Sequence, residues 1–165
     1  MSSIIKVDQI QLADGSTPTA GDLGLNTTGA VLQVVEGTGG AGETITTNTS
    51  YVATGCKVSI TPSSTTSKVL VIGSGGFNDV ATANKTMIFA LYKNSASLKD
   101  DITRVRSGAS GADTAAPLAF TFLDSPSTTS SVEYEVYIKA TTGTTIQFNN
   151  GTVTQARLCL MEIAG

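Results

Sequence analysis

The sequence predicts an all-β protein, a β-sandwich or barrel, with an extended N-terminal arm. Two observations lead to this prediction. Short runs rich in Val, Ile and Thr recur along most of the 165-residue chain, and clusters of Gly, Pro, Asn and Ser separate them. This rhythm is typical of sandwiches and barrels. Within several runs apolar and polar residues alternate, so one face of each strand is expected to be buried and the other hydrated.

The first 28 residues differ from the rest. The segment "IIKVDQIQL" alternates weakly, and the polar "ADGSTPTAGDLGLNTTG" after it carries too many glycines and a proline for a helix. We therefore expect residues 1–28 to form an extended attachment arm and residues 29–165 to form one folded head. The apolar side chains of the arm are its predicted points of attachment to a particle: Ile4, Ile5, Val7, Ile10 and Leu12.

Nine runs in the head are predicted strands, at 30–35, 51–60, 67–73, 86–93, 102–107, 118–124, 132–140, 145–149 and 156–164. The alternation is clearest in the run 132–138. There Val132, Tyr134, Val136 and Ile138 share one face, and Glu133, Glu135, Tyr137 and Lys139 share the other. Cys56, Val58 and Ile60 alternate in the same way with Lys57 and Ser59.

The last run is apolar on both faces. Leu158, Leu160 and Glu162 oppose Cys159, Met161 and Ile163. Such a pattern indicates a central strand or a strand at a contact between subunits. We expect Leu158, Leu160 and Glu162 to make this contact, with Glu162 partly buried and bonded to a backbone group or to a basic side chain of the next subunit.

The stretch "SKVLVIGSGGFN" (67–78) invites comparison with a dinucleotide-binding fingerprint. Gly73 and Gly75 fill its first two glycine positions, but Asn78 stands at the third. No helix-like segment follows, since Met87–Leu91 is continuously apolar, as in a strand. The stretch is therefore predicted to be a core strand that enters a Gly-rich loop, with no nucleotide site.

The sequence also lacks the residues that most other catalytic sites need. The chain has no His, and two Cys are too few for a zinc site. The carboxylates available for acid–base work are Asp79, Asp100, Asp101, Asp113, Asp124, Glu133 and Glu135, and most fall in turns or on hydrated faces. Asn78-Asp79 and Asp100-Asp101 lack the full oxygen-ligand spacing of a calcium site. We expect no enzyme activity, no cofactor and no metal.

Partners are constrained by charge and by aromatic content. The formal net charge of −3 argues against nucleic acid as a partner. Arg104 and Arg106 share a face and could bind a carboxylate or an acidic sugar, although a solvated strand face is the simpler interpretation. Four tyrosines, Tyr51, Tyr92, Tyr134 and Tyr137, could stack on a glycan, but aromatic residues make up only 5% of the chain.

The chain is expected to be made in a cytoplasm and not to enter a membrane. Its N-terminal segment lacks the continuous apolar core of a secretory signal, and no run of 18 apolar residues occurs. Cys56 and Cys159 are therefore predicted to remain buried free thiols.

Several runs resemble small structural proteins of tailed bacteriophages of the cyanophage and marine-phage type. They are "IIKVDQIQLADGSTPTAGDLGLNTTGAVLQVV", "TPSSTTSKVLV", "DSPSTTSSVEYEVYIKA" and the terminal "LMEIAG". The resemblance implies a jelly-roll head similar to tumour-necrosis-factor-like domains, assembled as a homotrimer on the virion exterior and attached to capsid or tail proteins. No long repetitive shaft precedes the head, which suits a short knob or a capsid decoration. The alternative is a tail-fibre head that binds host surface glycans.

Overall fold

The structure is a computed structural model that describes residues 10–18, 21–23, 28–39, 44–80, 83–109, 114–149 and 155–165. All regular structure in these ranges is β-strand: β1 (Val31–Thr38), β2 (Thr44–Thr46), β3 (Val52–Ile60), β4 (Lys68–Val80), β5 (Thr86–Lys93), β6 (Ala96–Arg106), β7 (Thr114–Asp124), β8 (Val132–Ala140), β9 (Ile146–Phe148) and β10 (Ala156–Ile163). The all-β prediction is confirmed. No helix in the described ranges is long and apolar enough to cross a membrane.

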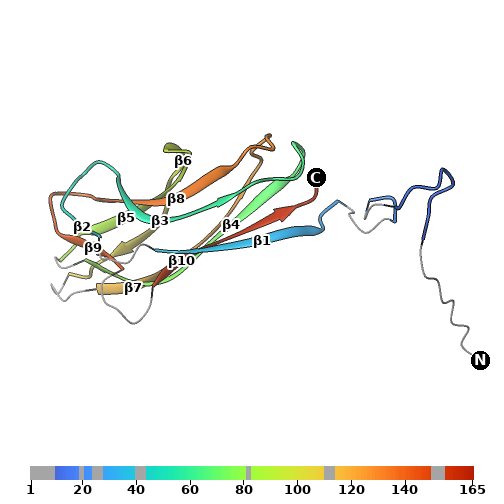
Figure 1. Ribbon diagram of the computed structural model, residues 1–165. Helices are drawn as coiled ribbons and strands as arrows, with labels where there is room; N and C mark the ends of the chain where they lie inside the picture. Colours follow the sequence, from blue (N-terminus) through green and yellow to red (C-terminus); the bar gives the residue numbers. More distant parts are fainter. Residues whose placement is uncertain are drawn as a thin grey trace, which may run out of the picture.

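The strands form two antiparallel sheets that face each other as a β-sandwich (Figure 1). One sheet has six strands in the order β1-β10-β4-β9-β2, with β7 also paired to β4; the other has four, in the order β3-β8-β5-β6. Most consecutive strands change sheet, as β3, β4 and β5 do, while β5 and β6 form a hairpin within one sheet. The final strand β10 lies between β1 and β4, which confirms the prediction of a central strand.

The core lies between the two sheets and consists of the apolar half of each alternating pattern. In β8, Val132, Tyr134, Val136 and Ile138 are at most 2% exposed, whereas the intervening side chains are half-buried. Cys56, Val58 and Ile60 of β3 are also buried, while Lys57 and Ser59 are exposed. Both predicted alternations are therefore confirmed. Each large apolar side chain buried in this way stabilises the fold by roughly 1.5–3 kcal/mol.

The Gly-rich stretch is part of a strand, and its prediction as a loop is wrong. Strand β4 continues through the glycines to Val80 and pairs with β7 as far as Thr114. The register shifts between Gly75 and Asn78, and Gly75 and Gly76 have φ angles of +79° and +74°. Glycine adopts these angles without steric cost, so the one extra residue in β4 forms a bulge that bends the strand without ending it.

Other bounds also differ from the prediction: β7 begins at Thr114 and not at 118, and β1 continues to Thr38 and not only to 35. Strand β6 begins at Ala96, six residues before the predicted run at 102–107. Asn94 and Ser95 have φ angles of +49° and +64°, and two such residues make the tight turn of the β5–β6 hairpin. The short strand β2 was not predicted, because its three residues show no alternation that sets them apart from a Thr-rich loop.

The described residues before β1 lie outside the sandwich. Residues 10–18 and 21–23 contain no strand, and all except Pro18 are exposed. They extend away from the end of the sandwich at which the C-terminus lies (Figure 1). Among the described residues, the first to join the sheet are Gly29, whose N donates to Ala164 O at 2.8 Å, and Ala30, whose O accepts from Ala164 N at 2.8 Å. The division into arm and head stays a prediction.

Candidate functional site

The outer face of the six-stranded sheet carries a row of apolar side chains that we call the apolar row: Val34, Met161, Leu70 and Leu123. These residues are direct neighbours across four adjacent strands, β1, β10, β4 and β7. Val34 is 57% exposed and Leu123 53% exposed, and the two central members are half-buried. The pairing register, and not proximity in sequence, therefore brings them together.

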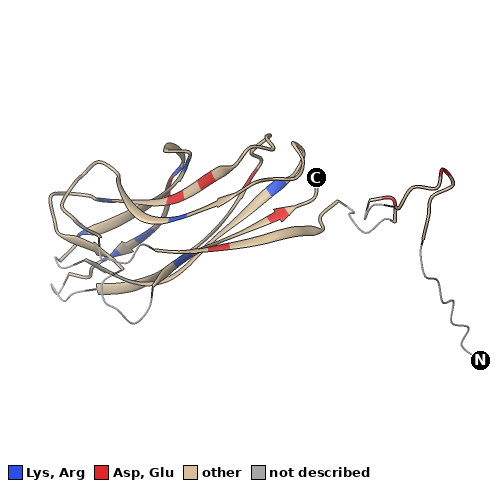
Figure 2. Cartoon of the chain, viewed as in Figure 1, with Lys and Arg blue, Asp and Glu red and all other residues tan. Residues whose placement is uncertain are grey.

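Other apolar side chains widen the row on both sides. Ile163 and the exposed Val31 lie toward the start of β1, and Cys159 and Ile72 lie on the other side. A groove of about 550 Å³ is lined by Leu70, Leu123 and Ile163 and also by the exposed Lys68. Most of the ribbon of β1, β10, β4 and β7 carries no charge (Figure 2). Single exposed apolar residues are common on protein surfaces, but a contiguous apolar surface of this kind is typical of an interaction site.

The residues predicted to make the subunit contact lie on the opposite side of the sheet. Leu158, Leu160 and Glu162 are 0% exposed within the single chain. Because side chains alternate along a strand, Cys159, Met161 and Ile163 take the outer face of β10. A second copy could contact those three residues but not the three that were predicted. The contact itself is untested and stays a prediction.

Glu162 is a buried carboxylate held by hydrogen bonds. Gln33 Nε2 donates to Oε2 at 2.6 Å, and Ser63 donates to Oε1 from both its backbone N and its Oγ, each at 2.7 Å. Burial alone would raise the pKa of Glu162, but these hydrogen bonds outweigh it and lower the pKa to about 2. The carboxylate thus joins β1, β10 and the segment after β3 within one chain.

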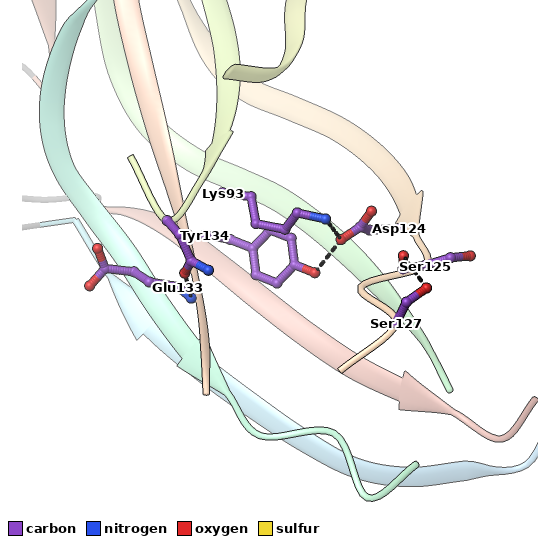
Figure 3. Close-up of polar contacts among 7 residues, drawn as sticks. Lys93, Asp124, Ser125, Ser127, Glu133 and Tyr134 are labelled. Carbon is purple, nitrogen blue, oxygen red and sulfur yellow. Dashed lines mark hydrogen bonds and ion pairs between the residues drawn. The ribbon is translucent and has the colours of Figure 1, made fainter. Parts of the chain in front are cut away.

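A second buried carboxylate connects the two sheets. Asp124 ends β7, and its Oδ2 accepts from Lys93 Nζ at 2.9 Å and from Tyr134 Oη at 2.7 Å (Figure 3). Lys93 and Tyr134 belong to β5 and β8 of the opposite sheet. Burial, together with the hydrogen bond to Asp124 and its charge, raises the pKa of Tyr134 well above the usual range. All three groups are engaged with each other, which indicates a structural role for this cluster.

The outer face of the four-stranded sheet carries three half-buried tyrosines that we call the tyrosine cluster: Tyr51, Tyr92 and Tyr137. The rings of Tyr92 and Tyr137 stack with centroids 3.8 Å apart and planes at 12°. Tyr51 meets Tyr92 edge to face at 6.1 Å, and Lys139 Nζ lies 4.2 Å from the centroid of the Tyr51 ring. Tyr134, the fourth tyrosine, is in the core. The sequence named all four but could not show that three of them meet.

The other predicted site residues are dispersed. Arg104 is paired with Asp101, Lys57 Nζ lies 3.0 Å from Glu133, and Asp100 accepts from Ser97 Oγ. Arg106 is exposed. Asn78 is buried and bonded to backbone groups of Ala116 and Asn149. Ile4, Ile5, Val7 and Asp113, and the side chain of Asp79, lie outside what the structure describes, and Ile10 and Leu12 are 52% and 37% exposed. Within the described residues, no group of three acidic or thiol side chains could hold a metal.

Both cysteines are free, as predicted, but only one is buried. Cys56 is buried on the inner face of β3, and this burial, aided by the charge of Glu135, raises its thiol pKa to about 12. Cys159 is half-buried on the outer face of β10, next to the apolar row. Cys56 therefore lies inside the sandwich, and Cys159 lies on its outer surface.

No protein-family model matches the chain, and no curated protein is similar to it. Among solved structures, one match is described as "Structure of infectious bursal disease virus Gx strain". Its TM-score is 0.46 at 9% sequence identity, and the match covers 81% of this chain and 32% of that one. The chain thus spans about a third of the length of that neighbour.

Proposed function

We propose that the protein is a non-enzymatic structural subunit on the exterior of a tailed-phage virion, assembled as a homotrimer and attached by residues 1–28. The observation that carries the proposal is the apolar row. It crosses four strands, a width of roughly 14 Å at the usual strand spacing. A lone chain leaves this surface in water, whereas a second copy seated on it would remove it.

The virion context and the trimer rest on the sequence resemblance. The strand order adds support for the jelly roll that the resemblance implies. Strands β1, β10, β4 and β7 oppose β3, β8, β5 and β6, and the chain crosses between these two sheets at nearly every connection. Double-sheet jelly rolls built from eight strands are common in viral subunits. In a closed ring of three, each apolar row would meet the next subunit.

A passive role agrees with how the acidic side chains are used. Glu162 and Asp124 are buried and bonded, and Asp101 and Glu133 are paired with basic groups. Catalysis near neutral pH needs a group that exchanges protons there, and the chain has no His.

The test is the mass of the protein in solution. Light scattering of the wild-type chain at micromolar concentration should give a trimer. Leu123→Glu places a charge in the apolar row and should yield a folded monomer. Thr129→Glu, the same change in charge at an exposed loop residue, should leave the trimer intact. A wild-type protein that stays monomeric both in solution and on particles would overturn the proposal.

The alternative is a receptor-binding head that recognises host glycans. One specific observation favours it, namely the gathering of three tyrosines on an outer sheet face.

A further inference from the structure

We propose that the tyrosine cluster is a binding site for a neutral saccharide, which would stack on the face of the Tyr137 ring opposite Tyr92. The site lies on the four-stranded sheet, and the apolar row lies on the six-stranded sheet. Assembly through the apolar row would therefore leave the tyrosine cluster exposed. The inference stands on its own contacts and does not depend on the oligomeric state.

The rings form a continuous series that ends at Tyr137. Tyr92 covers one face of Tyr137, while the edge contact from Tyr51 falls on Tyr92. Among the described residues, no ring or cation contact is found on the other face of Tyr137, and this is the face on which the ligand would stack. The C–H groups of a pyranose carry partial positive charge and are attracted to the electron-rich face of such a ring.

The neighbouring strand leaves room beside this ring. Tyr137 pairs directly with Ala53 of β3, and Gly55 follows two residues later. Both are exposed, and a Cβ built on Gly55 would meet no atom within 4 Å. Ala53 and Gly55 therefore leave space beside Tyr137, and Glu135 Oε1, which accepts from Gly55 N at 3.0 Å, borders that space. A ligand stacked on Tyr137 would lie over these two small residues and meet the Glu135 carboxylate as a hydrogen-bond acceptor.

Charged groups of both signs surround the rings. Glu133, Glu135 and Lys57 act on Tyr137, and Asp100 acts on Tyr92 and Tyr51. Burial, followed by these carboxylates, raises the pKa of Tyr92 and Tyr137, so both hydroxyls stay protonated and can donate. Carboxylates, ammonium groups and hydroxyls together match the many donors and acceptors of a sugar. The basic groups Lys57, Lys139 and Arg104 offset these carboxylates, and a site without a dominant charge favours a neutral saccharide over a polyanion such as nucleic acid.

The cluster is held in place before any ligand arrives. The backbone N of Asp101 donates to Tyr51 Oη at 3.1 Å, and Lys139 lies over the ring of Tyr51. Asp101 is in turn paired with Arg104. Beneath the rings, Ala90 and Ile88 of the same outer face are 0% and 8% exposed. Because the rings are already ordered, binding would cost little side-chain entropy.

The experiment measures binding to immobilised neutral oligosaccharides of glucose, galactose, mannose and N-acetylglucosamine, with sialylated oligosaccharides alongside. We expect at least one neutral oligosaccharide to bind the wild-type protein. Tyr137→Ala should weaken that binding about tenfold or more, while Tyr137→Phe, which keeps the ring, should stay within about threefold. Circular dichroism and melting temperature confirm that each variant is folded.

Three outcomes would overturn the inference. They are no binding to any neutral oligosaccharide, binding that Tyr137→Ala leaves unchanged, and a preference for sialylated oligosaccharides, which would move the site toward Arg106. The chain has no Trp, so tyrosine fluorescence offers a second readout, and its change on ligand addition should disappear in Tyr137→Ala. If saccharide binding fails while the trimer is intact, the assembly proposal still stands. If the protein is monomeric but binds a neutral saccharide through Tyr137, the saccharide proposal still stands.

Discussion

At the scale of single residues, Glu162 shows how a buried charge is tolerated. Three hydrogen bonds reach its two carboxylate oxygens, and Gln33 and Ser63 provide all three. A carboxylate buried without such partners would protonate instead. The residue was expected to be partly buried and to bond either to a backbone group or to a basic side chain of the next subunit. It is fully buried within the chain, and the backbone N of Ser63 is one of its donors; a bond to a second subunit stays a prediction.

Glu162→Gln should destabilise the fold at pH 7 by about 2 kcal/mol, because an amide nitrogen replaces one acceptor and faces donors. The folded-state pKa is lowered from 4.5 to about 2. The stabilisation is therefore present above pH 4.5 and is lost as the pH falls toward 2. The difference in unfolding free energy between the wild-type and variant proteins should narrow over that range. Urea unfolding at several pH values measures it.

The matched control is Glu36→Gln, at an exposed position of β1 paired with Arg157 at 2.8 Å. An exposed pair contributes at most about 1 kcal/mol, so this variant should stay near wild type at every pH. If the loss of unfolding free energy in Glu162→Gln did not change with pH, it would come from altered packing and not from the carboxylate charge.

Gly73 shows what residue-level reasoning missed. In the sequence it matches the first glycine of a nucleotide fingerprint, yet packing is what requires a glycine at this position. A Cβ on Gly73 would lie 2.1 Å from Cε1 of Phe120 on the neighbouring strand. The glycine makes room for that ring within the sheet. No local pattern announces this requirement, because Phe120 is distant in sequence and becomes a neighbour only through the β4–β7 register.

At the scale of elements, the alternating strands could be predicted and the irregular ones could not. The bounds of β5 and β8 follow directly from their apolar runs and flanking turn residues. Strand β4 continues through a bulge, and β6 begins after a two-residue turn that lacks glycine. The end of β4 and the start of β6 therefore could not be predicted from the sequence. Burial patterns are encoded locally, whereas bulges and tight turns depend on the strand that pairs alongside.

The contact between the ends of β7, β5 and β8 depends on Asp124. Asp124→Asn should cost about 2 kcal/mol of stability, because Lys93 would lose its partner charge while only 27% exposed. Tyr134→Phe should cost about 1 kcal/mol, since one hydrogen bond is lost without an unpaired charge. Thermal and urea unfolding provide the measurement.

The control for Asp124→Asn is Glu133→Gln, which removes the same charge from a pair with Lys57 that is more exposed than the pair of Asp124 with Lys93. It should change stability by less than about 0.5 kcal/mol. Lys93→Met added to Asp124→Asn should recover part of the loss, because it removes the uncompensated ammonium group. If Asp124→Asn behaved like Glu133→Gln, the cluster would not be what holds the sheets together at this end.

At the scale of the whole molecule, the surfaces that matter are products of topology. The apolar row combines residues from β1, β4, β7 and β10, and the tyrosine cluster draws on β5, β8 and the residue before β3. The sequence indicated that β10 is apolar on both faces, but it could not indicate which face is outward. Alternation placed Tyr134 and Tyr137 on opposite faces of one run, but it could not show that Tyr51 and Tyr92 lie beside Tyr137. Strand order and register decide both points.

The described residues of the predicted arm contribute little to the fold of the head. Ile10, Leu12 and Leu23 are 52%, 37% and 46% exposed, so they add little to the core. Pairing of the chain with β10 begins at Gly29 and Ala30. Deleting residues 2–28 should therefore leave a cooperatively folded sandwich, with unfolding free energy within about 0.5 kcal/mol of wild type.

Thiol labelling of the deletion variant tests both its fold and its assembly, because Cys56 lies inside the sandwich and Cys159 lies on its outer face. Cys56 is buried, and its raised pKa of about 12 leaves almost no thiolate at pH 8, so it should resist alkylation until the protein unfolds. Cys159, half-buried on the outer face, should react in any chain whose apolar row is uncovered and should be protected where a second copy covers it. Rapid labelling of Cys56 in the deletion variant would mean that the sandwich has opened, and the arm would then belong to the fold. Slow labelling of Cys56 with fast labelling of Cys159 would mean that the sandwich folds alone and that assembly requires the arm. Protection of both thiols would mean that the apolar row assembles without it, so that residues 1–28 remain free to attach the subunit to a particle.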